Sequence, residues 1–307
     1  MISNPLSNAL FLPTMVRIGC LLLAGALLVA VVEWRNLLHP RTIAGSTLFR
    51  RIFSWAVMAP TFALGVFAGG APALVIVLYL SLQSVREFGR MTRMSRPYVA
   101  MLAVLVPITI LVAAAAPGVF PYLPIAAFLV LSGFALLRGE TAGSYRELTI
   151  ALFGYLYLPV LLSFFVLIGR HMPHGTVVLL AVGMAVALSD VCAFTIGKLA
   201  GGPRLAPQIS PNKTAAGALG NVLGAYAGFA VMAFALPASW PLALVAGLPA
   251  LIAVASVWGD LLESLIKRTF AVKDTGATLP GFGGILDRID SLIVAMPVTF
   301  FALRLAG

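Results

Sequence analysis

The densest group of charged residues in the 307-residue sequence lies between positions 260 and 291, in DLLESLIKRTFAVKDTGATLPGFGGILDRIDS. This stretch holds five of the ten carboxylates and four of the twenty Lys and Arg residues, although only 10% of the whole chain is charged. The carboxylates are Asp260, Glu263, Asp274, Asp287 and Asp290, and the cations are Lys267, Arg268, Lys273 and Arg288. Such a concentration of charge in an apolar chain indicates a functional site.

The first part of the stretch has helical spacing. Asp260, Glu263 and Lys267 stand at i, i+3 and i+7, and Ser264 and Arg268 form the adjacent row. Two carboxylates and two cations therefore line neighbouring faces at the end of an apolar helix.

The second part combines glycines with further carboxylates. Asp274 follows Lys273, Asp287 and Asp290 open the last apolar segment, and the glycines between them allow a backbone to approach a ligand closely. Carboxylates without His or Cys suit Mg²⁺, which prefers oxygen ligands, and the neighbouring cations suit phosphate oxygens.

Two other places carry polar residues that could join this site. Asp190 lies deep in the apolar run GMAVALSDVCAFTIGKLAGG, where a carboxylate is tolerated mainly beside a polar cavity or a cation. Lys213, with Ser210 and Thr214, precedes a helix whose first backbone N–H groups favour anions. Each has a structural alternative: a helix-packing contact through Ser189 and Asp190, and a snorkelling lysine beside a capping hydroxyl.

Together these residues predict metal-assisted phosphoryl or nucleotidyl transfer, in which positioning and charge neutralisation supply most of the rate. A solvated loop with surface ion pairs is the alternative for 260–291. We favour the chemical function because the neighbouring helix ends are charged too.

The elements that position these residues are membrane helices. The hydrophobic fraction is 61%, and an all-α polytopic membrane protein is expected. About ten segments approach the length needed to cross a bilayer: 17–34, 52–69, 71–85, 99–116, 120–137, 149–168, 176–197, 214–236, 241–262 and 291–305. The second, third and last are short, so nine helices would also fit. We expect an added anchor helix and basic linker at 1–51, a membrane scaffold at 52–148 and a catalytic core at 149–307.

The net charge of +10 is explained by topology rather than by nucleic-acid binding. If the N-terminus is outside, 17 of the 20 Lys and Arg residues fall in cytoplasmic loops. The positive-inside rule then predicts that both termini are outside and that the charged site faces the cytoplasm.

Three motifs resemble those of one family. Segment 264–290, SLIKRTFAVKDTGATLPGFGGILDRID, closely resembles the signature of phosphatidate cytidylyltransferases, the CDP-diacylglycerol synthases. DVCAFTIG at 190–197 and ISPNKTAAG at 209–217 resemble the upstream motifs of that family, and the likeness extends over about 49–305.

This resemblance implies a multi-pass enzyme of the cell inner membrane that condenses CTP with phosphatidic acid, with Mg²⁺, to give CDP-diacylglycerol and pyrophosphate. The implied cofactor is one or two Mg²⁺ ions, or one with a monovalent cation, and a homodimer is a possible assembly. The implied metal ligands are Asp190, Asp260, Glu263, Asp287 and Asp290. Lys213 and Lys267 would act with Asp190, Asp260 and Asp287 in catalysis. Ser210, Thr214, Ser264, Arg268, Lys273 and Arg288 would bind substrate.

Two positions depart from the family pattern. Phe282 stands where the family has His, and Ala216 stands where it usually has Glu. These departures imply either a changed nucleotide or lipid preference or a weakened enzyme, and we favour activity because the other charged positions persist. Phe282→His is expected to be tolerated or to raise activity.

Two rival functions use similar parts. A CTP-dependent lipid kinase would transfer the γ-phosphate instead, and a lipid or anion transporter would also contain an intramembrane carboxylate and helices interrupted by Gly and Pro. Against the transporter, the charges cluster at one face and no inverted repeat is evident in the sequence.

Overall fold

A computed structural model describes residues 4–32, 47–276 and 283–306 of the chain. The chain divides into two compact units, Met1–Ala73 and Leu74–Gly307. The functional boundaries expected at residues 51 and 148 remain predictions.

The first unit contains a short 3₁₀ turn and two long helices. These are η1 (Pro5–Ser7), α1 (Phe11–Val32) and α4 (Thr47–Ala68). The rings of Phe11 and Phe67 meet edge to face with centroids 5.3 Å apart. Gly25 allows α1 and α4 to approach closely, because a Cβ there would lie 2.9 Å from Ile52 Cδ1.

The second unit contains the remaining helices, beginning with α5 (Gly70–Thr92), whose first residues precede the boundary. The helices that follow are α6 (Arg96–Ala115), η2 (Phe120–Tyr122), α7 (Leu123–Arg138), α8 (Ser144–Tyr155), the π-helical turn η3 (Leu156–Val160), α9 (Leu161–His171), α10 (Gly175–Ala200), α11 (Ala215–Met232), η4 (Ala233–Ala235), α12 (Leu242–Thr269) and α13 (Leu286–Ala306).

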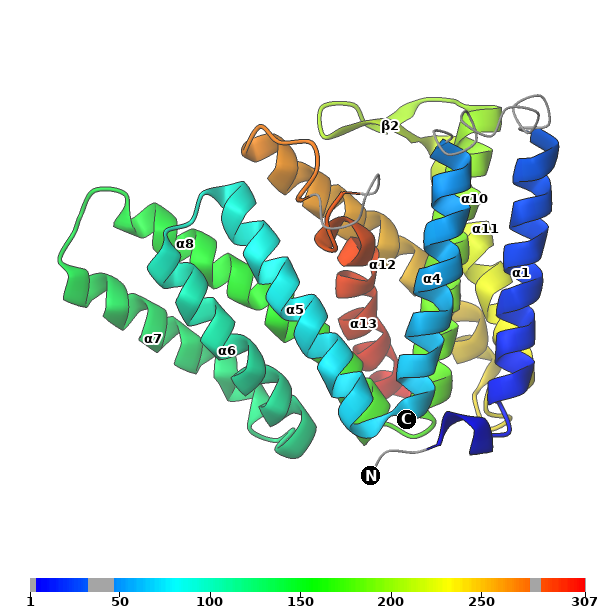
Figure 1. Cartoon of the computed structure of the whole chain (residues 1–307), viewed down its shortest axis with the longest axis horizontal. Coiled ribbons are helices and arrows are strands. Elements are labelled where there is room, and N and C mark those ends of the chain that lie inside the picture. The colour runs from blue at the N-terminus through cyan, green and yellow to red at the C-terminus, as the bar shows by residue number, and fades with distance from the viewer. Residues whose placement is uncertain (1–3, 33–46, 277–282, 307) are drawn as a thin grey trace. The chain divides into compact units, whose positions relative to one another are not determined.

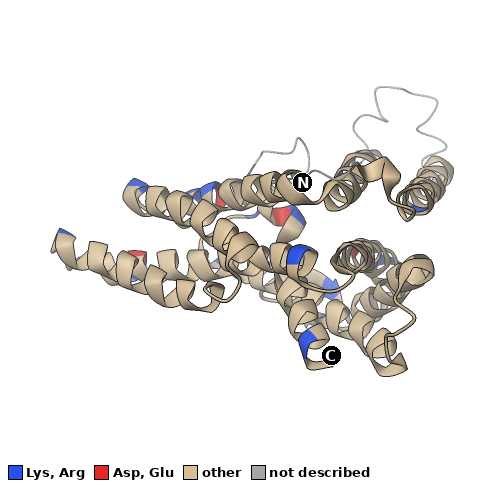
Figure 2. Cartoon of the chain, turned by 90° about the horizontal axis from the view of Figure 1, so that it is seen from below, with Lys and Arg blue, Asp and Glu red and all other residues tan. Residues whose placement is uncertain are grey.

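The described residues form nine helices that are long and apolar enough to cross a membrane, and a shorter apolar helix covers Ile52–Ala68. Each of the ten predicted segments coincides with a helix over most of its described residues. Segment 149–168 belongs to one span, Ser144–His171, formed by α8, η3 and α9. Large apolar side chains such as Val104 and Leu111 are exposed on α6, as expected for a surface that faces lipid. Charged residues occupy few positions along the ribbon (Figure 2). The chain is therefore a multi-pass membrane protein.

Helices α10 and α11 pack closely along their length (Figure 1). Glycines on α11 make this possible, because a Cβ on Gly220 would lie 2.6 Å from the Cys192 carbonyl oxygen and one on Gly228 would lie 2.5 Å from Ala185 Cα. Small residues bring membrane helices into backbone contact in this way. The packing fixes the part of α10 that carries Asp190.

Helices α12 and α13 also lie side by side (Figure 1). Gly259 allows a close approach of the two helices, because a Cβ there would overlap the Asp290 carbonyl oxygen. The residues that follow Gly259 on α12 therefore lie against the first turns of α13.

The described residues confirm the expected all-α fold, to which one short two-stranded hairpin is added. Strand β1 (Arg204–Ala206) pairs antiparallel with β2 (Ser210–Thr214), with Arg204 opposite Thr214 and Ala206 opposite Ser210. The hairpin joins α10 to α11 (Figure 1).

Candidate functional site

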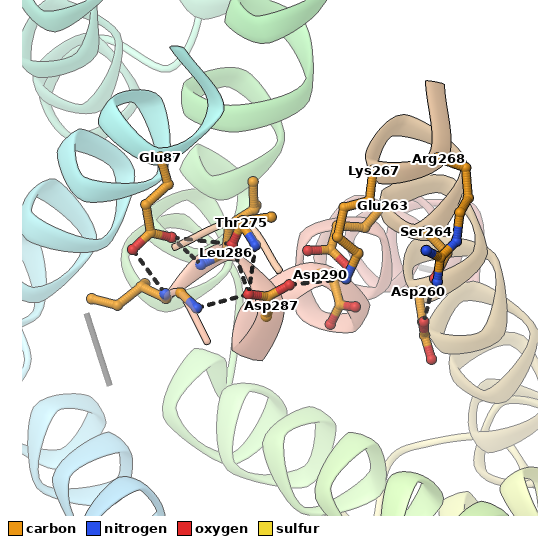
Figure 3. A network of polar contacts seen from close by, with 12 residues as sticks. Glu87, Asp260, Glu263, Ser264, Lys267, Arg268, Thr275, Leu286, Asp287 and Asp290 are labelled. Carbon is orange, nitrogen blue, oxygen red and sulfur yellow. Dashed lines mark hydrogen bonds and ion pairs between the residues drawn. The ribbon is translucent and has the colours of Figure 1, made fainter. Parts of the chain in front are cut away.

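Lys267 is the centre of the charged cluster on α12. Its Nζ forms an ion pair with Glu263 on the same helix and lies 2.9 Å from Asp287 Oδ1 on α13. All three side chains are largely buried, with 13% of Lys267, 1% of Glu263 and 6% of Asp287 exposed. One buried cation thus neutralises carboxylates from two helices (Figure 3).

The second oxygen of Asp287 holds the loop before α13. Asp287 Oδ2 accepts hydrogen bonds from Gly284 N at 2.7 Å, Thr275 N at 3.0 Å and Thr275 Oγ1 at 2.8 Å. Gly283 adopts φ +82°, and a Cβ there would lie 2.5 Å from the same oxygen. Both oxygens of Asp287 therefore bind donors from the protein.

Lys213 connects the hairpin to α12. Its Nζ lies 2.6 Å from Asp260 Oδ2, and Ser264 Oγ donates to Asp260 Oδ1 at 3.3 Å. Arg268 Nε donates to the Ile209 carbonyl oxygen at 3.3 Å, which is a second bond between the hairpin and α12. The side chains of Lys213 and Asp260 are more exposed than those around Lys267, at 20% and 40%.

Three carboxylates of like charge approach one another from three helices. Asp190 on α10 interacts electrostatically with Asp260, Lys213 and Arg288. Asp290 on α13 interacts with Asp260 and Asp190, and its Oδ1 accepts a hydrogen bond from Ser291 N at 2.8 Å. The structure therefore brings Asp190, Asp260 and Asp290 into one neighbourhood.

Several predicted substrate-binding residues lie at the edge of this neighbourhood. Thr214 ends β2 and caps α11, because its Oγ1 accepts a hydrogen bond from Gly217 N at 3.1 Å. Ser210 begins β2, Lys273 is exposed just after α12, and Arg288 is exposed in the first turn of α13.

The two residues that depart from the family pattern are Phe282 and Ala216. Phe282 lies outside the described residues. Ala216 lies in the first turn of α11 and is partly exposed.

The donor set suits a hard cation, but the described side chains do not form a ready-made metal site. No group of three or more Asp, Glu, His or Cys among the residues that the structure describes is arranged to hold a metal ion. The available donors are carboxylate oxygens, as Mg²⁺ prefers. Glu263 Oε1 is buried and accepts no hydrogen bond from the described residues. Carboxylates that lie close together are stabilised either by a cation or by protonation of one of them.

Glu87 belongs to this network, although it is not among the site residues predicted from the sequence. Its side chain is fully buried, and it accepts hydrogen bonds from Ile285 N at 3.1 Å and Leu286 N at 2.9 Å. Figure 3 shows Glu87 and Thr275 on the opposite side of Asp287 from Lys267. Helical periodicity provides the missed signal: Glu87 shares a helix face with Ser84 and Met91, which are buried, and Arg86 lies on another face.

Comparisons with known proteins identify a family that this chain resembles over most of its length. The model of the cytidylyltransferase family matches residues 49–306. A phosphatidate cytidylyltransferase of Brucella suis is 40% identical over 130 residues, covering 42% of this chain and 47% of the relative. Its namesake from Helicobacter pylori is 42% identical over 144 residues, covering 47% and 52%, and that from Bacillus subtilis is 31% identical over 179 residues, covering 58% and 66%.

The chain spans about half the length of the first two of these relatives. The family match extends over most of the chain and includes every charged residue of the site. This chain therefore belongs to the cytidylyltransferase family.

Proposed function

We propose that this protein transfers the cytidylyl group of CTP to the phosphate of phosphatidic acid, producing CDP-diacylglycerol for phospholipid synthesis. The observation that carries the proposal is the meeting of carboxylates from α10, α12 and α13 with Lys213 and Lys267 in one neighbourhood. Three relatives named phosphatidate cytidylyltransferase support it.

In the proposed reaction, a phosphate oxygen of the lipid attacks the α-phosphorus of CTP. A new P–O bond forms, the bond from the α-phosphorus to the bridging oxygen breaks, and both its electrons leave with pyrophosphate. No general base is required, because the attacking phosphate is already an anion. The protein's task is to align two anions and to neutralise charge on the leaving group.

The cations have separate proposed tasks. Lys213 lies in the more exposed part of the site and would contact the phosphates of the nucleotide, as Arg268, Lys273 and Arg288 would. Lys267 is buried between two carboxylates, so it would act from within the site. Ser210, Thr214 and Ser264 would add hydroxyl donors.

We further propose Mg²⁺ as the cofactor, as one or two ions or one ion with a monovalent cation. The proposed ligands are Asp190, Asp260, Glu263, Asp287 and Asp290. When bound, the ion supplies charge neutralisation at the phosphates. Lys213 and Lys267 engage three of these carboxylates in the structure, so metal binding requires side-chain rearrangement.

The proposed setting is the cell inner membrane, with the site on the cytoplasmic face, where CTP is available. The distribution of Lys and Arg supports this orientation, and ten spans would place both termini outside. Helix α4 has 22 residues, which is compatible with a tenth span. A homodimer remains a prediction.

One assay separates the proposal from its rivals. The purified protein in lipid nanodiscs is given Mg²⁺, phosphatidic acid and CTP labelled at the α-phosphate. We expect the label to enter lipid only when phosphatidic acid is present. Label that remains in CDP while the lipid gains phosphate would indicate a kinase, and no transfer at all would contradict an enzymatic role.

A further inference from the structure

The buried face of α5 carries a carboxylate that binds the backbone of a distant segment. Glu87 Oε1 accepts a hydrogen bond from Ile285 N, and Oε2 accepts one from Leu286 N. Gln83 Nε2, one turn earlier on α5, donates to Oε1 at 3.1 Å. About 200 residues of chain separate Glu87 from the backbone groups that it binds.

These two backbone groups lie at the start of α13. Leu286 is the first residue of the helix, so its N–H has no partner within the helix. A carboxylate at a helix N-terminus satisfies such groups and interacts favourably with the helix dipole. Bonds from an ionised carboxylate to N–H groups are also stronger than neutral ones. Glu87 thus fixes the point at which α13 starts.

The surrounding glycines show that this contact requires close approach. A Cβ on Gly284 would overlap Glu87 Oε2 and Thr275 Oγ1, and a Cβ on Gly276 would lie 3.2 Å from Glu87 Cδ. The glycines on both sides of the loop therefore leave room for the Glu87 side chain. The glycine-rich motif therefore accommodates a protein side chain, in addition to allowing a ligand to approach the backbone.

Thr275 couples Glu87 to the charged cluster. Its Oγ1 lies 2.8 Å from Asp287 Oδ2 and 3.5 Å from Glu87 Oε2. Asp287 directly follows Leu286 and forms an ion pair with Lys267. A change in how Glu87 holds Leu286 would therefore move Asp287 relative to Lys267.

We propose that Glu87 is a positioning residue of the site. Its carboxylate holds the backbone of Ile285 and Leu286, so that Asp287 is presented to Lys267 in one geometry. The proposal deepens the proposed function and rests on it for the activity measurement, while the local hold on the backbone can be measured without activity.

The test compares Glu87→Gln with a matched control in the full-length protein in lipid nanodiscs. Gln keeps the size of the side chain and one acceptor oxygen. Its NH₂ group cannot accept a hydrogen bond, so one of the two backbone N–H groups loses its acceptor. Glu147→Gln changes another partly buried glutamate, which accepts a hydrogen bond from Ser95 Oγ at 2.7 Å and contacts none of the site residues described above. Glu87→Asp keeps the charge but is one methylene shorter.

The first readout is amide hydrogen exchange. In Glu87→Gln, we expect exchange across 283–288 to accelerate at least about tenfold, while α10 exchanges as in the wild type. Unchanged exchange at 283–288 would overturn the proposal, and so would a uniform increase across the chain, which would show a general loss of stability.

The second readout is turnover. We expect kcat to fall about tenfold in Glu87→Gln and about 100-fold in Glu87→Asp, with KM for CTP nearly unchanged and with full activity in Glu147→Gln. Local loss of protection with unchanged kcat would overturn the positioning role. If the wild type transfers no cytidylyl group, the proposed function fails, and hydrogen exchange alone decides whether Glu87 holds the loop.

Discussion

The two halves of the site differ in burial and in what their charged groups bind. Around Lys267, the carboxylates of Glu263 and Asp287 are almost fully buried, and their partners come from the protein itself. Around Lys213, the side chain of Asp260 is 40% exposed, and the pair joins a hairpin to a helix. We interpret the buried half as the support that fixes the geometry of the site and the exposed half as the part that receives the nucleotide.

Removal of Lys267 should have the largest effect, because the buried half depends on it. Lys267→Met would leave Glu263 and Asp287 without their shared cation in a buried position, so we expect a loss of stability of about 3–5 kcal/mol and no measurable turnover. Thermal unfolding measures the stability, and the labelled-CTP assay measures the turnover. Lys198→Met, at an exposed position near the end of α10, is the control and should change neither. A stable and active Lys267→Met protein would remove the distinction between the halves.

Asp260→Asn should separate activity from stability in the exposed half. Because the Asp260 side chain is 40% exposed, we expect the unfolding midpoint to change little, while kcat falls about 100- to 1000-fold and the Mg²⁺ concentration needed for half-maximal activity rises. Turnover measured across a Mg²⁺ titration is the test. An unchanged Mg²⁺ requirement would argue against Asp260 as a ligand.

Lys213→Gln should give the smallest of these effects. The ion pair with Asp260 is partly exposed and should contribute only about 0.2–1 kcal/mol to stability. We expect KM for CTP to rise about tenfold, with a smaller change in kcat, because Lys213 would bind phosphate in the ground state as well as in the transition state. Steady-state kinetics measure this. If kcat fell and KM did not change, Lys213 would instead support the geometry of the site, as the residues of the buried half do.

The helices could be predicted from the sequence because their signal is local. Apolar runs of membrane length determined the positions of the spans, and the i, i+3, i+7 spacing from Asp260 to Lys267 correctly placed these residues on one helix, α12. The hairpin at Arg204–Thr214 had no such signal. Its strands are short, and tertiary bonds from Lys213 and Arg268 tie it to α12.

The role of Glu87 was also missed because it depends on tertiary contacts. Its partners at Ile285 and Leu286 are backbone groups far away in the sequence, and a backbone donor has no residue-type signature. In the sequence, Glu87 lies among arginines, and such basic residues are expected to anchor a loop to anionic lipid headgroups. Only the three-dimensional packing of α5 against the loop before α13 reveals what the carboxylate binds.

The most direct test of the account compares the wild type with Asp287→Asn in the transfer of label from α-labelled CTP to phosphatidic acid. Asp287 links the buried half to the loop before α13 and is also a proposed metal ligand. We predict label in lipid for the wild type and none above background for Asp287→Asn, with the variant still folded. Full transfer by Asp287→Asn would contradict the assignment of this site.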